Sequence, residues 1–181
     1  LLWAKAWGDV PVFKGSMWYP LWKVAAPAFL LLPDFLRLLL MVVVVTGSSI
    51  YFNLILNKHE VLYKNSYLPA FLFALFSSSI PSFLSVHPFH FTNLLILFVL
   101  DQGYSLYREG RPVATLFNAG LAIGLCLLFA MPLTPFVLFA LLQLSILRSF
   151  QLREYLVLLI GLFLPAFYLA VVWFPQPLFD N

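Results

Sequence analysis

Long apolar runs separated by short polar stretches dominate the chain. Six runs are candidate spans. A helix needs roughly 20 apolar residues to cross a bilayer, and the third to fifth runs are shorter than that. They cover about residues 35–56, 67–86, 91–107, 115–131, 136–147 and 155–174. The pattern predicts an all-α fold, a polytopic transmembrane helical bundle with about six spanning helices. The fourth and fifth runs are short, so a partly buried hairpin is an alternative for that pair.

The chain before the first run has a different character. Residues 1–34 hold four of the five tryptophans and four prolines, with no uninterrupted membrane-length run. Proline blocks a continuous helix, and tryptophan favours the membrane–water boundary, so this part is predicted as an interfacial or re-entrant segment with room for a short helix. Residues 35–175 then form the transmembrane domain and 176–181 a tail. Because the chain begins at Leu1, we expect it to be a piece of a longer protein.

Two runs contain residues that disturb helices. The second run holds three consecutive serines followed by Pro81, and the sixth holds Gly161 and Pro165. Serine hydroxyls can bond to the carbonyl groups that a membrane proline frees. The second run is therefore predicted to be a kinked span.

Composition supports a lipid environment. Hydrophobic residues make up 63% of the chain and charged residues 9%, against roughly 45–50% and 25% in ordinary soluble domains. That polar surface is too small to coat a water-soluble globule of this size, so the lipid bilayer is the first predicted partner. The net charge of +3 is spread over separate loops, which argues against nucleic-acid binding. Cys126 is the single cysteine, so no intrachain disulfide forms.

Loop charges predict the orientation in the membrane. Basic residues follow the first, third and fifth runs, whereas the connections after the second and fourth runs have none. These residues are Lys58, Lys64, Arg108, Arg111, Arg148 and Arg153. By the positive-inside rule, loops 57–66, 108–114 and 148–154 are predicted to be cytoplasmic. Residues 1–34 then lie outside, although they carry Lys5, Lys14 and Lys23.

Asp101 is an acidic residue inside the third run, and an intramembrane carboxylate is a functional candidate by default. It lies less than two turns from the predicted cytoplasmic end, and Arg108 follows seven residues later, close to the same helix face. Pairing of Asp101 with Arg108 is the favoured interpretation. Exposure of Asp101 to a polar cavity is the alternative.

His87 and His90 have a spacing that places two imidazoles on one side of a helical turn, as in some metal sites. No third ligand lies near them in the sequence, so interfacial residues at a turn beside Pro88 are the favoured interpretation. No cofactor or metal is predicted. Glycine loops for phosphates and nucleophile-elbow motifs are also missing from the sequence.

Small residues form a ridge in the fourth run. Gly120 and Gly124 stand four apart with alanines beside them, a pattern that lets another helix approach closely. The partner helix is predicted either within this chain or on another subunit. Asn118, like Asn53 and Asn93, is predicted to hydrogen-bond between helices, worth on the order of 1 kcal/mol.

Three strings together resemble one protein family. They are NKHEVLYKNSYLPAFLFALFSS, LFNAGLAIGLCLLFAMP and LRSFQLREYLVLLIGLFLPAF. In this order and spacing the chain resembles, over roughly residues 35–175, an uncharacterised family of bacterial multi-pass inner-membrane proteins known only as a domain of unknown function. The resemblance implies a location in the bacterial inner membrane and a longer chain. It implies no activity.

The expected function is a non-catalytic membrane subunit or scaffold of a bacterial cell-envelope complex, which assembles with other membrane proteins through helix–helix contacts. The alternative is a transporter, or an enzyme like the lipid-linked glycan transferases and polymerases, with Asp101 in a polar cavity. The outer connections lack the acidic or arginine-rich site that such enzymes use. The subunit hypothesis is therefore favoured.

Overall fold

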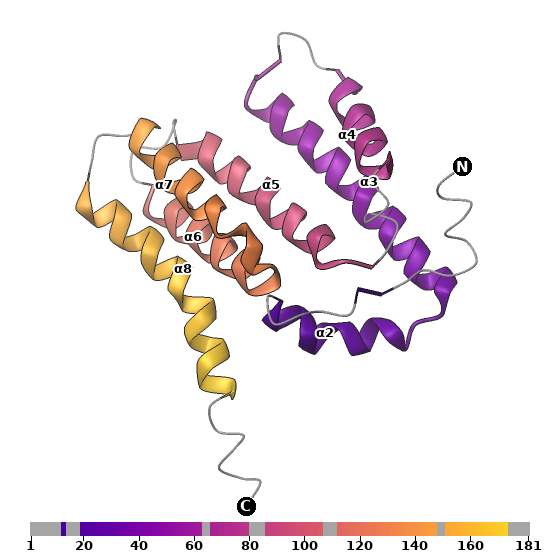
Figure 1. Cartoon of the computed structure of the whole chain (residues 1–181). Helices are drawn as coiled ribbons and strands as arrows, with labels where there is room; N and C mark the ends of the chain where they lie inside the picture. The colour runs from indigo at the N-terminus through magenta and orange to yellow at the C-terminus, as the bar shows by residue number, and fades with distance from the viewer. Residues whose placement is uncertain are drawn as a thin grey trace, which may run out of the picture. The chain divides into compact units, whose positions relative to one another are not determined.

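Helices make up almost all of the structure, a computed structural model that describes residues 12–13, 19–62, 66–79, 86–106, 112–147 and 151–173 (Figure 1). The elements are α2 (Pro20–Leu30), α3 (Asp34–Lys58), α4 (Leu68–Ser79), α5 (Pro88–Leu106), α6 (Val113–Phe129), the 3-10 helix η2 (Met131–Leu133), α7 (Pro135–Leu147) and α8 (Leu152–Trp173). Within these ranges Val12 and Val86 form an isolated bridge, and no strand occurs. The all-α prediction is confirmed.

Among the described residues, two helices are long and apolar enough to cross a membrane. They cover Asp34–Lys58 and Leu152–Val171, with mean hydropathies of 2.1 and 2.0. α4, α6 and α7 are shorter apolar helices. α5 begins at Pro88, a few residues before its predicted start, because a proline in the first turn lacks only an N–H that has no helical acceptor there. Pro81 and the kink predicted beside it lie outside the described residues.

The chain divides into two compact units, Leu1–Leu97 and Phe98–Asn181, with the boundary inside α5. The first unit holds α2, α3, α4 and the beginning of α5. The second holds the end of α5 with α6, η2, α7 and α8. Each unit has its own means of holding its helices together.

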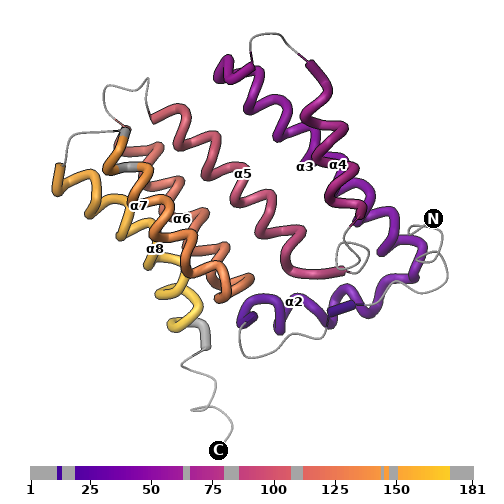
Figure 2. The backbone as a smooth tube through the Cα atoms, turned by 45° about the horizontal axis from the view of Figure 1, so that its top comes forward, coloured from indigo at the N-terminus to yellow at the C-terminus, as the bar shows by residue number. Residues whose placement is uncertain are grey.

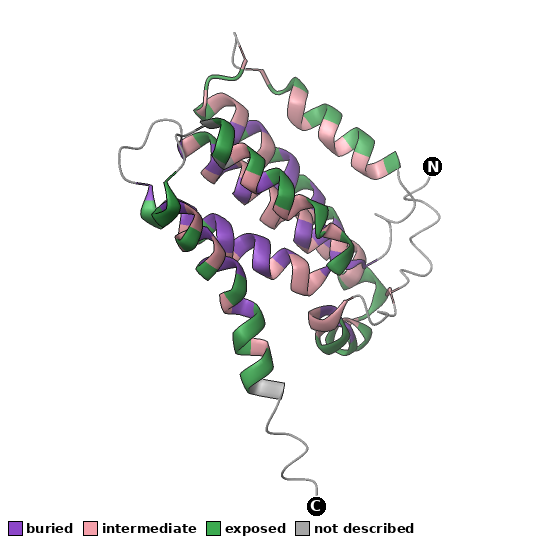
Figure 3. Ribbon diagram, turned by 60° about the vertical axis from the view of Figure 1, so that its left-hand side comes forward, coloured by how far each residue is buried: buried purple, intermediate pink, exposed green. Residues whose placement is uncertain are grey.

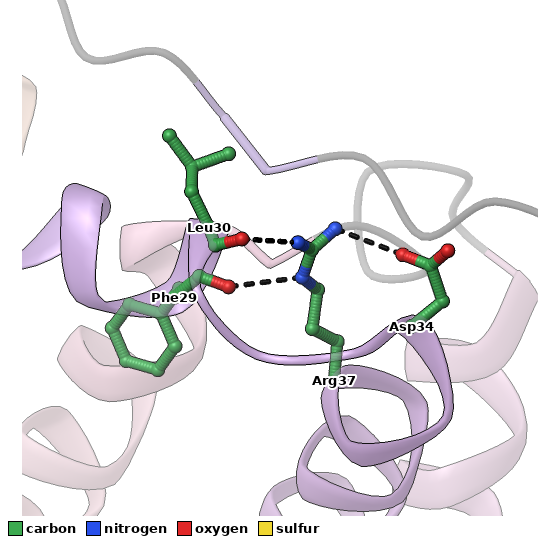
Figure 4. Close-up of polar contacts among 4 residues, drawn as sticks. All are labelled: Phe29, Leu30, Asp34 and Arg37. Atoms are coloured by element: carbon green, nitrogen blue, oxygen red, sulfur yellow. Dashed lines mark hydrogen bonds and ion pairs between the residues drawn. The ribbon is translucent and has the colours of Figure 1, made fainter.

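In the first unit, Arg37 joins the end of α2 to the start of α3 (Figure 4). Its Nε and Nη2 donate to the carbonyl oxygens of Phe29 and Leu30 at 2.9 and 2.8 Å. Its Nη1 pairs with Asp34 Oδ1 at 2.9 Å. A cation at a helix C-terminus and a carboxylate in a first turn both oppose the partial charges of the helix ends. Arg37 therefore fixes the turn between the two helices.

Aromatic residues hold α2 against the beginning of α5. The cluster consists of Phe13, Tyr19, Trp22, Phe29, His87, Phe89 and Phe91. Trp22 is fully buried and stacks on Phe29 with ring centroids 5.3 Å apart. Its Nε1 donates to the Phe13 oxygen at 2.8 Å, and the Phe13 N–H donates to the Val86 oxygen at 3.0 Å. The buried indole N–H is thus satisfied, as burial of a polar group requires.

The C-terminus of α3 ends in a Schellman motif built without glycine. The N–H of Glu60 donates to the Asn57 oxygen at 3.2 Å, and the N–H of Val61 to the Leu56 oxygen at 3.0 Å. This pair of bonds places the residue after the cap in the left-handed region, where Glu60 has a φ of 52°. A side chain is strained there, and glycine is not.

In the second unit, α6, α7 and α8 pack beside the end of α5 (Figure 2). Leu106, Leu116 and Leu158 form a buried cluster, which Leu141, Tyr155 and Val157 cover. Exposed residues predominate on α8 beyond Leu162, in the part that leads to the C-terminus in Figure 3. The unit therefore has an apolar interior and apolar outer faces.

We expect Glu60→Gly to raise the free energy of unfolding by about 0.5–1 kcal/mol, because glycine adopts a positive φ without strain. Glu60→Ala removes the same carboxylate but keeps a Cβ in the strained conformation. Thermal unfolding of the detergent-solubilised variants separates the two effects. An equal gain in both variants would show that charge, not backbone strain, is responsible.

Candidate functional site

In the second unit, α6 and α8 cross closely at three glycines. A Cβ added at Gly120 would overlap the carbonyl oxygen of Leu158, and one at Gly124 that of Leu162. From the other side, a Cβ at Gly161 would meet the Phe117 oxygen at 2.5 Å. The ridge predicted from the sequence thus meets α8 of the same chain. This surface of α6 is therefore covered within the chain.

Pro165 completes this crossing. Its Cγ lies 3.1 Å from the position that a Cβ of Gly124 would take. A proline has no N–H to donate to the carbonyl four residues earlier, which here belongs to Gly161. α8 nevertheless continues to Trp173. The glycine and the proline, which in the sequence looked like interruptions of a span, are the surface of α8 that α6 contacts.

Asn118 lies on α6 but takes no part in the crossing with α8. It is exposed on α6, between residues that face the interior. Of the other two asparagines considered, Asn53 is buried in α3, and its Oδ1 has no hydrogen-bond partner among the described residues. Asn93 is half-buried in α5. The three amides therefore occupy three different environments.

Five polar side chains lie at one end of the second unit, which we call the polar end. It comprises Asp101 and Gln102 of α5, Thr115 of α6, Gln143 of α7 and Glu154 of α8. These positions lie near the C-termini of α5 and α7 and the N-termini of α6 and α8. Asp101 and Glu154 are buried, with 9% and 6% of their surfaces exposed. Arg108 and Arg111 lie outside the described residues, so the predicted pairing of Asp101 with Arg108 stays a prediction.

A glycine and a glutamine meet at this end. The side-chain amide of Gln143 occupies the place where a side chain at Gly103 would stand. Neither residue was among the predicted site residues. The signal available was one glutamine in the fifth apolar run and one glycine near the end of the third, but nothing in the sequence places them opposite one another.

His87 belongs to the aromatic cluster of the first unit, and His90 is its neighbour in the chain. His87 precedes α5, and His90 lies in its first turn. The ring of His87 packs at centroid distances of 4.2 Å on Phe13 and 4.5 Å on Phe89. Burial, and after it the neighbouring His90, lowers the pKa of His87 from 6.5 to about 4. Across the described residues, no group of three or more His, Cys, Asp or Glu side chains is arranged to hold a metal ion.

Comparisons with protein-family models, with curated proteins and with solved structures find no match to this chain. The resemblance to an uncharacterised inner-membrane family therefore stays a prediction. The function has to be argued from the chain's own geometry.

We expect Gly124→Ala to destabilise the chain by about 1–3 kcal/mol, because the new methyl group pushes against a backbone carbonyl that cannot move without separating the helices. Gly47→Ala in α3 is the matched control, since no atom lies within 4 Å of the added Cβ. Higher helix propensity makes that variant neutral or more stable by up to about 1 kcal/mol. Thermal unfolding of both variants is the measurement, and equal effects would contradict the crossing.

Acidification is expected to destabilise the first unit through His87. The pKa of His87 is lower in the folded chain, about 4 against 6.5, so the neutral ring contributes stability above pH 6.5. That contribution is lost as the pH falls through this range toward 4. We expect the thermal midpoint to fall more between pH 7 and pH 4.5 in the original chain than in His87→Gln. If the thermal midpoint falls equally with pH in the original chain and in His87→Gln, this role of His87 is ruled out.

Proposed function

We propose that the chain is a non-catalytic helical subunit of a membrane assembly, embedded in a bilayer and held to another membrane protein through an outer face of α6. The observation that carries the proposal is the exposed amide of Asn118. α6 carries no charged residue, and Asn118 lies three residues from its midpoint, about 4.5 Å along the axis. An uncovered amide at that depth in lipid lacks hydrogen-bond partners, and a helix from another subunit supplies them.

The outer faces of both long helices support a lipid environment. Phe35, Val43 and Leu54 on α3, and Phe163 and Phe167 on α8, are each more than half exposed. Water-soluble monomers rarely expose apolar patches of this extent. In a bilayer the same side chains face a solvent as apolar as themselves.

Helix lengths bear on how the chain crosses the bilayer. α3 with 25 residues and α8 with 22 reach about 37 and 33 Å, which matches a hydrocarbon core of about 30 Å. α4 with 12 residues and α7 with 13 reach only about 18 and 20 Å. We infer six passages, with loops 57–66, 108–114 and 148–154 on the cytoplasmic side of a bacterial inner membrane. The two short helices then rely on local thinning of the bilayer or on tilt of their neighbours.

Arg37 was not among the charges used to predict orientation. It adds a fourth basic residue to the N-terminal side, yet its charge is balanced by Asp34 and by two helix carbonyl groups. A neutralised arginine has little attraction for the cytoplasmic side. Arg37 therefore does not change the orientation that we propose from the basic residues of the loops.

A second candidate function rests on the two buried carboxylates of the polar end. Asp101 and Glu154 lie within one four-helix unit, and intramembrane carboxylates mark ion and substrate paths in transporters. A transporter, or a lipid-linked glycan transferase or polymerase-like enzyme, is therefore the alternative. Asp101 does not line the cavity at the polar end that contains its neighbours Gln102 and Gly103, which favours the subunit hypothesis.

The test is recovery of a partner from membranes in mild detergent. We expect the tagged chain to co-purify with another membrane protein or a second copy of itself. Asn118→Leu should weaken the association about fivefold and reduce recovery accordingly, as a loss of roughly 1 kcal/mol at a contact implies, without lowering the amount of chain in the membrane. Asn118→Gln keeps an amide and should retain part of the recovery, and Ile160→Leu on exposed α8 should change nothing.

A stable monomer that binds a small ligand would contradict the subunit hypothesis. Asp101→Asn then tests the alternative: loss of a transport or transfer activity at unchanged abundance supports it. Lower abundance, partly restored by removing Arg108 as well, indicates a structural ion pair. Orientation is checked separately with single cysteines in a Cys126→Ser background. Labels at Ser66 and Gln151 should react from the cytoplasmic side, and one at Thr134 from the other.

A further inference from the structure

A small cavity lies among four helices at the polar end of the second unit. Its volume is about 20 Å³. α5, α6 and α7 each contribute one polar side chain to its wall, namely Gln102, Thr115 and Gln143. The rest of the wall is apolar and includes Leu116, Leu158 and Ala140.

The size of this cavity matches one small molecule. A cavity needs roughly 10–15 Å³ of probe-occupied volume to hold a water, and a bound water typically makes about three hydrogen bonds. Cavities of purely apolar wall stay empty, whereas those with two to four polar partners are hydrated. With three polar side chains from three helices, this cavity belongs to the hydrated class.

The position of Gln143 gives the water a structural task. Its amide lies against Gly103, where no side chain is present to bond with it. A primary amide offers two N–H donors and an acceptor oxygen with two lone pairs. Inside a bilayer each polar group left without a partner costs several kcal/mol. A water in the cavity supplies both a donor and an acceptor at this point.

We propose that this cavity binds a single water molecule, which hydrogen-bonds to the Gln143 side chain and links it to Gln102 and Thr115. The water joins α5, α6 and α7 at the polar end. It is an internal ligand of the helix unit and does not depend on any partner subunit.

Two variants of equal shape test the proposal. Ala140 is buried on α7 and lines the cavity, so Ala140→Val and Ala140→Thr both fill the space that the water occupies. The threonine hydroxyl can take the place of the water as a hydrogen-bonding partner of Gln143, but the valine methyl cannot. We expect Ala140→Thr to unfold at a thermal midpoint several degrees above that of Ala140→Val. A midpoint for the valine variant equal to or higher than that of the threonine variant overturns the proposal.

A second measurement uses the unaltered chain. X-ray irradiation converts bound water to hydroxyl radicals, which modify the side chains next to it. Leu116 lines the cavity, whereas Ile123, two turns later on the same helix, does not, although both are almost fully buried. We expect modification at Leu116 to exceed that at Ile123 at least severalfold. Equal labelling at the two positions means a dry cavity and also overturns the proposal.

Discussion

Direct backbone contact between α6 and α8 is the constraint on which the second unit depends. In a bilayer, side chains gain little by leaving lipid for another apolar helix, so association rests on close packing and on weak Cα–H···O contacts. Gly120 and Gly124 on one helix and Gly161 on the other allow that approach. Each glycine lowers helix propensity by about 1 kcal/mol relative to alanine. The close crossing offsets this loss, and it sets the spacing at which Leu116 and Leu158 meet.

The polar end follows from the same spacing. Helices that cross this closely leave no room for large polar side chains at the crossing, so those side chains gather beyond it, near the helix ends. Gln143 fits because α5 presents Gly103 opposite to it. The first unit uses other means, an arginine that bonds to helix carbonyl groups and a cluster of aromatic rings. In the first unit the indole N–H of Trp22 and the guanidinium of Arg37 are thus satisfied within the chain.

Sequence patterns predicted those features that depend on neighbours in the chain. The ends of α3 and α8 fall close to the predicted ones because apolar runs bounded by charges and prolines define them. The spacing of Gly120 and Gly124 indicated a close contact, but it left the partner open. The reciprocal surface on α8 pairs Gly161 with Pro165, so it lacks the repeated small residue that makes such a surface visible. The role of Arg37 in joining α2 to α3 was overlooked because its bonds to α2 go to backbone carbonyl groups, which every sequence has.

The assignment of the glycine ridge to α8 changes where an assembly surface is sought. Once the ridge is used within the chain, the outer faces of the helices present mainly leucine, isoleucine, valine and phenylalanine, for which lipid competes as well as any protein. In the proposed assembly, recognition between subunits then comes from groups that lipid cannot satisfy. On α6 that group is Asn118, because its amide is exposed close to the helix midpoint. The exposed amide of Asn118 is thus stronger support for a partner than the apolar surface around it, because lipid covers an apolar surface but does not bond to an amide.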